Sequence, residues 1–304
     1  MSYQMMNRPY SQHYIDAMKK DAVTVAAQKD ELYQELLQKA PEYEVKAQNA
    51  KIDQIWKAIP GYNGLKVNIE KSYKKMKRAG AFDEKLLVYD QVKPDVHLES
   101  LKPEPIYRGH PDKPMVSFII NVAWGNEYLQ EMLPVLEKHR VKATFFLEGR
   151  WVKHHSELAK AIQNGGHEIG NHSYNHPDMS KLTRERISEQ LRMTNEQIEE
   201  TLGVKPKWFA PPSGSFRKEV VDQAHKMGMG TIMWTVDTID WQKPQPAVLQ
   251  QRVLSKVHNG AMILMHPTDP TAKSLAVLIQ NLHEKGYQIG TVSQLMNEKR
   301  LVEE

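Results

Sequence analysis

The chain has 304 residues, of which 40% are hydrophobic and 26% charged, with a net charge of +4 and no cysteine. This length exceeds one usual domain, and no stretch approaches the roughly eighteen uninterrupted apolar residues of a membrane span, so we expect one large α/β domain, a smaller appendage and no transmembrane segment. The lack of cysteine excludes disulfides and thiolate metal sites, and the small net charge gives no reason to expect nucleic acid as a partner.

The first third of the chain predicts a small α+β domain behind a polar leader. Residues 1–20 lack the basic start and apolar core of a secretory signal, so we expect a disordered leader, and export cannot be inferred. Residues 21–92 combine a helical pattern, a Pro-Gly turn and two strand-like runs. The basic run 71–78 is interpreted as a solvated helix face, with an anionic polymer as the alternative partner. The prolines of residues 93–112 favour a linker or a strap across the next domain.

Residues 113–304 alternate between apolar strands and amphipathic helices. We predict strands at 115–121, 143–147, 168–169, 207–210, 231–236, 261–265 and 288–292, and helices at 127–139, 156–164, 184–202, 218–227, 247–258 and 272–285. About seven strands alternating with helices favour an α/β fold with a parallel sheet closed or nearly closed into a barrel. A doubly wound open sheet is the alternative. No glycine-rich phosphate motif follows a strand, so a nucleotide cofactor is not expected.

Polar residues recur at the carboxyl ends of these predicted strands, where (β/α) barrels place their chemistry. Asn121 ends the first strand, His172 and His176 follow the third, Asp240 follows the fifth and His266 follows the sixth. The two histidines are four residues apart, so a helical turn or a tight loop can aim both imidazoles at one divalent transition metal. Such a pair can arise by chance among 13 histidines, but its position among the other strand ends predicts a functional site.

Five segments between residues 113 and 298 carry a family resemblance. In chain order they read KATFFLEG, GGHEIGNHSYNHPDMS, WFAPPSGSF, WTVDTIDW and ILMHP. The chain thereby resembles the polysaccharide deacetylase family (NodB homology domain, carbohydrate esterase family 4 type), whose members remove acetyl groups from N-acetylglucosamine polymers such as peptidoglycan and chitin. The resemblance implies a distorted barrel, a zinc-type metal on two histidines and an aspartate, and hydrolysis of an acetamide. It also suggests an extracellular or cell-wall location.

The resemblance assigns roles to the strand-end residues. Amide hydrolysis needs a polarised carbonyl, a nucleophilic water and a protonated leaving amine. A divalent metal, zinc above all, on His172 and His176 would serve the first two needs. His266 suits the general acid, and Asp240 would orient its ring and raise its pKa. The alternatives are a satisfied loop histidine and a helix N-cap aspartate.

The resemblance also implies a groove for an N-acetylglucosamine-containing polysaccharide. Tryptophan rings would offer flat apolar faces to the sugar rings, unless they are core aromatics. The residues expected to line this groove are Trp208, Pro211, Pro212, Ser213, Trp241 and Leu264.

The first and third motifs depart from the family pattern. Members usually carry two adjacent aspartates after the first strand, a general base and a metal ligand, where this chain has Asn121 and Val122. An amide cannot accept the proton from water at neutral pH, and valine cannot bind metal. Ala210 replaces the arginine that pairs with the base aspartate, so both members of an ion pair are lost together. Asn126 and Glu127 are candidate substitutes for the base.

The sequence therefore predicts a metal-dependent polysaccharide deacetylase homologue with an altered base and weak or no activity. Removing a general base lowers a rate by about a hundredfold to ten-thousandfold, and losing a carboxylate ligand weakens metal binding further. The alternative is a non-catalytic protein that binds glycan or cell wall on the same fold. A hydrolase acting on another small amide is a third possibility.

Overall fold

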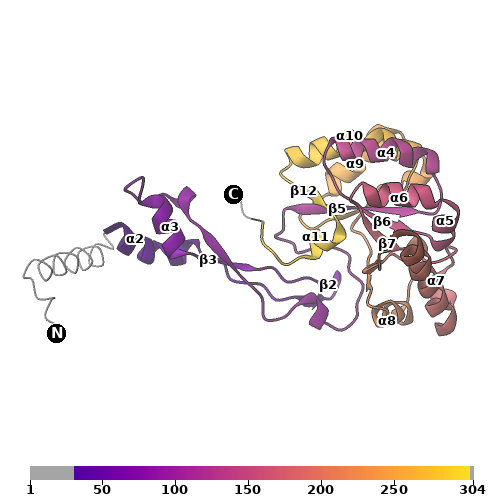
Figure 1. Ribbon diagram of the computed structural model, residues 1–304, viewed down its shortest axis with the longest axis horizontal. Helices are drawn as coiled ribbons and strands as arrows, with labels where there is room; N and C mark the ends of the chain where they lie inside the picture. The colour runs from indigo at the N-terminus through magenta and orange to yellow at the C-terminus, as the bar shows by residue number, and fades with distance from the viewer. Residues whose placement is uncertain (1–30, 302–304) are drawn as a thin grey trace, which may run out of the picture. The chain divides into compact units, whose positions relative to one another are not determined.

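The computed structural model describes residues 31–301, which form two compact units (Figure 1). Of the described residues, the first unit contains 31–47 and 64–92, and the second contains 48–63 and 93–301. The predicted leader, residues 1–20, lies outside the described residues. No helix in the described part of the chain is both long and apolar enough to cross a membrane.

The first unit is a two-stranded antiparallel sheet with helices. It comprises α2 (Glu31–Lys39), η1 (Ala40–Tyr43), β3 (Gly64–Val67), α3 (Ile69–Met76), η2 (Glu84–Leu86) and β4 (Tyr89–Val92). Its core contains Leu36 and Met76, both fully buried. The helical pattern predicted within residues 21–92 forms α2, which ends at Lys39 because Pro41 has no amide hydrogen to continue the α-helical bonds.

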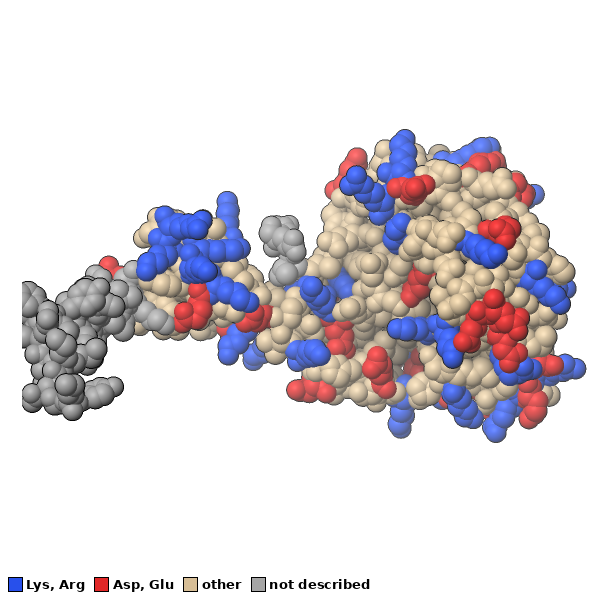
Figure 2. Space-filling model, viewed as in Figure 1, with Lys and Arg blue, Asp and Glu red and all other residues tan. Residues whose placement is uncertain are grey.

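Basic side chains gather on one side of the first unit (Figure 2). The run of residues 71–78 contributes exposed lysines from α3, and Lys71 lies 3.7 Å from Asp90. The buried residues of α3 are Ser72 and Met76, so the lysines occupy the opposite, solvated face. Binding of an anionic polymer by this face stays a prediction.

The second unit includes a hairpin that the sequence assigned to the small domain. Strands β1 (Lys51–Asp53) and β2 (Lys57–Ile59) pair antiparallel. Ala58 donates its amide to the carbonyl of Pro105 at 3.1 Å and is buried in the apolar cluster inside the large sheet. These contacts explain why residues 48–63 belong to the second unit.

Residues 93–112 pack as a strap rather than running free as a linker. They contain η3 (Leu98–Ser100), and Ile106 pairs in parallel with Ile232. The Ile106 amide donates to Thr231 and its carbonyl accepts from Met233, both at 2.8 Å. The strap thus satisfies backbone groups beside the edge strand of the large sheet.

One curled parallel sheet dominates the second unit, and it confirms the predicted α/β class and distorted barrel. Its strand order is β10-β11-β5-β6-β7-β8-β9, with β12 paired to the first half of β5. The strands are β5 (Met115–Val122), β6 (Thr144–Leu147), β7 (Glu168–Asn171), β8 (Trp208–Phe209), β9 (Gly230–Thr231), β10 (Val236–Asp237), β11 (Met262–Met265) and β12 (Gln288–Gly290). The prediction of one strand over 231–236 was wrong, because β9 and β10 lie at opposite ends of this order and the sheet stays a half-barrel.

Helices flank the sheet, and α4, α9 and α10 pack together on one side of β5 (Figure 1). The α-helices are α4 (Asn126–Lys138), α5 (Gly149–His154), α6 (Ser156–Asn164), α7 (Arg184–Leu202), α8 (Lys218–Lys226), α9 (Pro246–Lys256), α10 (Asp269–Glu284) and α11 (Val292–Met296). The short 3-10 turns are η4 (Met179–Lys181), η5 (Pro212–Gly214) and η6 (Asp240–Gln242). Helices α5 and α11 were not predicted, because five or six residues are too few to show a helical period.

The alternation of side chains along β5 defines the two sides of the sheet. Phe118, Ile120 and Val122 are fully buried in the cluster between the sheet and its helices. Ile119 belongs to a second cluster inside the curl, so Asn121, two residues on, faces the same inner side. The last two residues of β5 therefore point to different environments.

Candidate functional site

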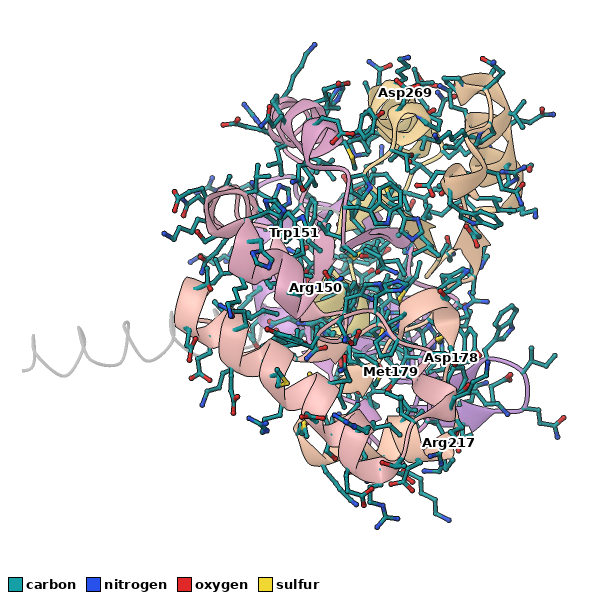
Figure 3. The ribbon with its side chains drawn as sticks, turned by 90° about the vertical axis from the view of Figure 1, so that its right-hand side faces the viewer. Arg150, Trp151, Asp178, Met179, Arg217 and Asp269 are labelled. Carbon is teal, nitrogen blue, oxygen red and sulfur yellow. The ribbon has the colours of Figure 1, made fainter. Side chains whose placement is uncertain are left out.

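The predicted site residues meet at the carboxyl edge of the curled sheet. Asn121 ends β5, His172 follows β7 and His266 follows β11, and β11 and β5 are neighbours in the sheet. The residues labelled in Figure 3 include Arg150, Asp178 and Asp269, which follow β6, β7 and β11 at this end of the unit.

The paired histidines have the geometry of metal ligands. The ring centroids of His172 and His176 are 5.1 Å apart. Nδ1 of His172 lies 2.8 Å from the carbonyl oxygen of Ala210, which can only accept, so Nδ1 carries the hydrogen and Nε2 keeps its lone pair. Burial lowers the pKa of His172 to about 3, with smaller contributions from His176 and His266. The ring is therefore neutral at pH 7, as a metal ligand must be.

Left-handed residues and side-chain hydrogen bonds fix the backbone of the loop that carries these histidines. Ser173 and His176 adopt left-handed conformations, with φ of 62° and 57°. The Ser173 hydroxyl accepts from the amide of His176 at 3.1 Å, and the Asn171 side chain accepts from the amide of Ser173 at 2.8 Å. Asn171 is in turn anchored to the carbonyl of Leu191 in α7 at 2.9 Å. These bonds orient both imidazoles before any ligand binds.

A second set of contacts joins the histidine loop to the loop after β8. Asp178 accepts from the hydroxyls of Ser180 and Ser215, and these bonds lower the pKa of its carboxyl group. Arg217 donates to the carbonyls of Ser180 and Leu182 at 3.0 and 2.7 Å. Figure 3 shows Asp178, Met179 and Arg217 close together on this side of the unit. Asp178 therefore has a structural task that explains its place in the histidine motif.

The structure brings His266 and Asp240 together. Asp240 is fully buried, and its Oδ1 lies 2.8 Å from Nδ1 of His266. Its Oδ2 accepts from the His266 amide at 2.5 Å and from the hydroxyl of Thr271 at 2.7 Å. Ile239 precedes it with φ of 52°, which is uncommon for a β-branched residue and aims the carboxylate inward. The pair can orient an imidazole whose Nε2 is free for proton transfer, although these catalytic roles stay predictions.

The two positions at the end of β5 carry no carboxylate. Asn121 is 4% exposed, and its Oδ1 has no hydrogen-bond partner among the described residues. The side chain of Val122 is buried in the cluster that faces the helices. Ala210 packs inside the curl, where the family pattern has an arginine. The positions expected to supply base, third ligand and counter-ion thus carry groups that can do none of these tasks.

The donor set is incomplete for a catalytic metal centre. Such zinc sites usually have three protein ligands, and His172 and His176 supply two. Within residues 31–301, no group of three His, Cys, Asp or Glu side chains is placed to hold a metal ion. Among the candidate substitute bases, Asn126 is engaged, because its Oδ1 accepts from the indole of Trp151 at 2.7 Å. Glu127 instead lines a neighbouring cavity.

That cavity, of about 510 Å³, lies beside Asp240. Two tryptophans on its wall are unusually exposed, Trp241 at 57% and Trp124 at 48%. The Trp124 ring also stacks on His266, with centroids 6.0 Å apart and planes at 8°. The sequence reasoning missed Trp124; an aromatic residue directly after the first strand, beside the altered base, was the available signal.

The remaining predicted groove residues differ in their accessibility. Leu264 is buried inside the curl, and Pro211 and Pro212 are buried at the start of η5. Ser213 is exposed in a left-handed conformation, with φ of 53°. Only Trp241 and Ser213 of the predicted set therefore present much surface to a ligand.

Trp208 lies away from the groove in which it was placed. Its indole reaches Glu168, the first residue of β7, so the side chain extends toward the amino ends of the strands and away from His172. Its indole N–H donates to the Ser293 hydroxyl at 2.8 Å and to the Glu168 carboxylate at 3.2 Å. The sequence could not reveal that β8 has only two residues and that Trp208 points toward α11.

The fold and the site together are a parallel half-barrel with a histidine pair and a buried Asp–His pair at its carboxyl edge. The polysaccharide deacetylase family model matches residues 108–232. Peptidoglycan-N-acetylmuramic acid deacetylase PdaA of Bacillus subtilis is 30% identical over 66% of this chain and 78% of its own length. The chain therefore belongs to the polysaccharide deacetylase family. Deacetylases of this family are generally metal-dependent.

Relatives with higher identity align over nearly the whole chain. The uncharacterized protein YlxY of Bacillus subtilis is 73% identical over 99% of this chain and 95% of its own length. The crystal structure of BA3943 from Bacillus anthracis, described as a CE4 family pseudoenzyme, is 56% identical with a TM-score of 0.86, covering 90% of this chain and 97% of that one. A BA3943 mutant is described as having restored enzymatic activity. A near relative thus has the deacetylase fold without the activity.

Proposed function

We propose that this protein is a polysaccharide deacetylase homologue with an altered catalytic base, which recognises an N-acetylglucosamine-containing polysaccharide such as peptidoglycan and hydrolyses it weakly or not at all. The observation that carries the proposal is the pair at the end of β5. Asn121 faces the site with an oxygen that has no hydrogen-bond partner in residues 31–301, and Val122 faces the helices. Neither can accept a proton from water at neutral pH. The pseudoenzyme description of the similar protein BA3943 supports the same reading.

The retained residues still suit parts of the reaction. His266, oriented by the buried Asp240, would donate a proton to a leaving amine. Zinc is the metal that we expect at His172 and His176, where it would polarise a carbonyl oxygen, but two ligands do not complete a catalytic centre. A location at the cell wall fits a peptidoglycan ligand and is part of the proposal.

Replacing Asn121 with Asp tests the altered base. We expect Asn121→Asp to raise acetate release from N-acetylglucosamine oligomers, by up to about a hundredfold to ten-thousandfold where the base alone limits the rate. Adding Ala210→Arg supplies a counter-ion for the new carboxylate and is expected to raise acetate release further. Asn121→Ala is the matched control, because it alters the same position without adding a carboxylate. Equal turnover by the wild type and Asn121→Asp would show that the chain uses another base.

A purely glycan-binding role is the second candidate, and the exposed tryptophans favour it. Trp124 and Trp241 present flat apolar faces beside the cavity of about 510 Å³, where solvent exposure of two such rings has no stabilising value. We expect Trp241→Ala to weaken binding of an N-acetylglucosamine tetramer by about tenfold in calorimetry, without a change in thermal stability. Binding that survives chelation of metal, with no turnover, would distinguish this role from hydrolysis.

A further inference from the structure

Two adjoining cavities lie at the amino ends of the strands, away from the edge that carries His172 and His266. One has a volume of about 440 Å³ and the other about 390 Å³. The four residues that line both are Leu98, Glu99, Lys207 and Trp208. Both volumes are within the range of roughly 300–1,000 Å³ that is usual for small-ligand pockets.

The indole of Trp208 is held rigidly between these cavities. Its N–H is bonded to Ser293 and Glu168, so the polar edge of the ring is satisfied inside the unit. The ring packs against Gly230, where an added Cβ would lie 2.6 Å from the ring atom Cζ3. Glycine is therefore required at that position for Trp208 to adopt this orientation. A fixed, partly exposed aromatic ring is a ready surface for stacking.

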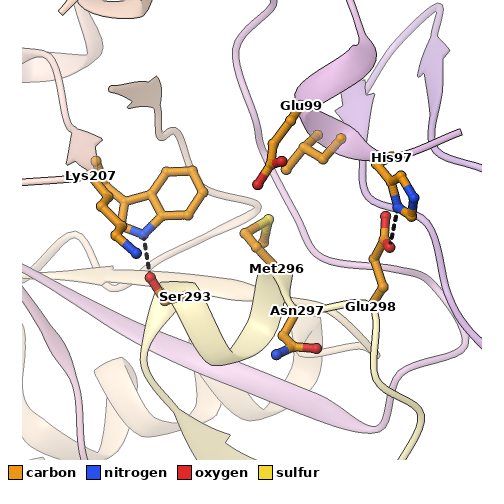
Figure 4. Close-up of a pocket in the computed structure, with 9 residues that line it drawn as sticks. His97, Glu99, Lys207, Ser293, Met296, Asn297 and Glu298 are labelled. Atoms are coloured by element: carbon orange, nitrogen blue, oxygen red, sulfur yellow. Dashed lines mark hydrogen bonds and ion pairs between the residues drawn. The ribbon is translucent and has the colours of Figure 1, made fainter. Parts of the chain in front are cut away.

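Polar groups of both charges surround this ring. Glu99 and Lys207 are exposed, and neither has an ion-pair partner among the described residues. Figure 4 shows Lys207 and Ser293 on one side of the first cavity and His97 and Glu298 on the other, where they form an ion pair with a distance of 2.6 Å. Lys102 and Glu104 line the second cavity, so lysines and carboxylates are balanced there as well.

From this arrangement we propose that the paired cavities around Trp208 bind an uncharged saccharide segment, at a site separate from the groove beside Asp240. An aromatic face bordered by unpaired carboxylate and ammonium groups can stack on a pyranose ring and hydrogen-bond its hydroxyls. The balanced charges give no preference for an anionic or a cationic ligand. The mixed polar lining is likewise unsuited to a purely apolar partner. Two saccharide sites on one chain would hold a polymer at two points and increase its apparent affinity.

Indole nitrogen–proton NMR tests this proposal on the full chain. The protein has six tryptophans, and a Trp208→Phe variant identifies the signal of Trp208. On titration with an N-acetylglucosamine tetramer, we expect a saturable shift of the Trp208 signal. The double variant Glu99→Ala, Lys207→Ala is expected to raise the apparent dissociation constant measured at this signal by about tenfold or more, because binding is weaker. Both side chains are exposed, so the variant is expected to fold normally.

Three comparisons make the result decisive. A matched double variant on the exposed ends of two helices, Lys256→Ala with Glu284→Ala, should leave the titration unchanged. Trp241→Ala should also leave the Trp208 shift intact, which separates this site from the proposed groove. The absence of a saturable Trp208 shift would overturn the proposal, as would a shift of equal affinity in the Glu99, Lys207 variant. A response to a short peptide but not to the tetrasaccharide would also overturn it. If the proposed function is wrong, the signals of Trp124 and Trp241 would not shift on titration, whatever the Trp208 signal does.

Discussion

Two halves of one site lie at the same edge of the sheet, and they differ in whether the expected carboxylate is present. After β10 and β11, the carboxylate of Asp240 accepts bonds from the ring and backbone of His266 and from Thr271. At the end of β5, the side-chain oxygen of Asn121 has no partner in the described part of the chain, and Val122 belongs to the apolar core. The Asp240–His266 pair has a structural role that does not depend on catalysis, since removing Asp240 leaves several donors without an acceptor. Retention of a catalytic-looking pair is therefore weak evidence for turnover.

The largest effect on stability is expected from Asp240→Ala. This variant leaves the donors from His266 and Thr271 without their buried acceptor, so we expect the free energy of unfolding to fall by about 3 kcal/mol. Urea denaturation measures the change. Asp269→Ala is the matched control, because Asp269 pairs with Lys273 at the surface and should cost about 0.5 kcal/mol or less. A loss below 1 kcal/mol for Asp240→Ala would refute its structural role.

A second prediction compares the buried histidine of the site with one outside it. Burial lowers the pKa of His167 to about 4, and its Nδ1 accepts from the Ala143 amide at 3.2 Å, which only the neutral ring can do. The folded pKa lies below the unfolded value of about 6.5, so the unfolded chain binds more protons between these values. The stability present above pH 6.5 should therefore decline as the pH falls from about 6.5 to 4.

Stability curves of the wild type and His167→Gln check this expectation. The variant should show a shallower loss of stability across that pH window, by an amount on the order of 1–3 kcal/mol at pH 4. Identical slopes would contradict it. Because His167 has this shift at the start of β7, a neutral buried histidine does not by itself mark a functional site, and the case for His172 rests on its free Nε2 and its neighbour His176.

The smallest effect is expected from Asn121→Ala. The Oδ1 atom of this side chain has no partner among the described residues, so truncation should change the free energy of unfolding by about 1 kcal/mol or less. Thermal or urea denaturation beside Asp240→Ala gives the direct comparison. A loss equal to that of Asp240→Ala would mean that the two halves of the site contribute alike to the fold.

Much of the large unit follows from local sequence rules. Helix α7 has its predicted bounds because Thr183 caps its start and Gly203, with φ of 69°, ends it. The contact between Asp240 and His266 was implied by the family resemblance, and the structure contains it. Periodicity carries this information wherever an element is long enough to repeat its pattern.

Other features depend on contacts that are remote in sequence. The hairpin of residues 51–59 belongs to the second unit because Ala58 packs inside the curled sheet, which no local pattern reveals. Trp208 was predicted to line the groove, but its indole is bonded to Glu168 and Ser293, which are remote from it in sequence. Trp124 was not predicted as a site residue, and its stacking on His266 identifies it. The positions of these residues depend on strand length and tertiary packing, which residue type alone does not predict.

One paired measurement on the wild type tests the central claim most directly: zinc content after dialysis, together with acetate release from an N-acetylglucosamine tetramer, with His172→Ala as the control. With two ligands and no base, the account predicts that zinc is lost on dialysis and that acetate release equals that of the control. Stoichiometric zinc retained by the wild type, with acetate release that His172→Ala abolishes, would contradict it.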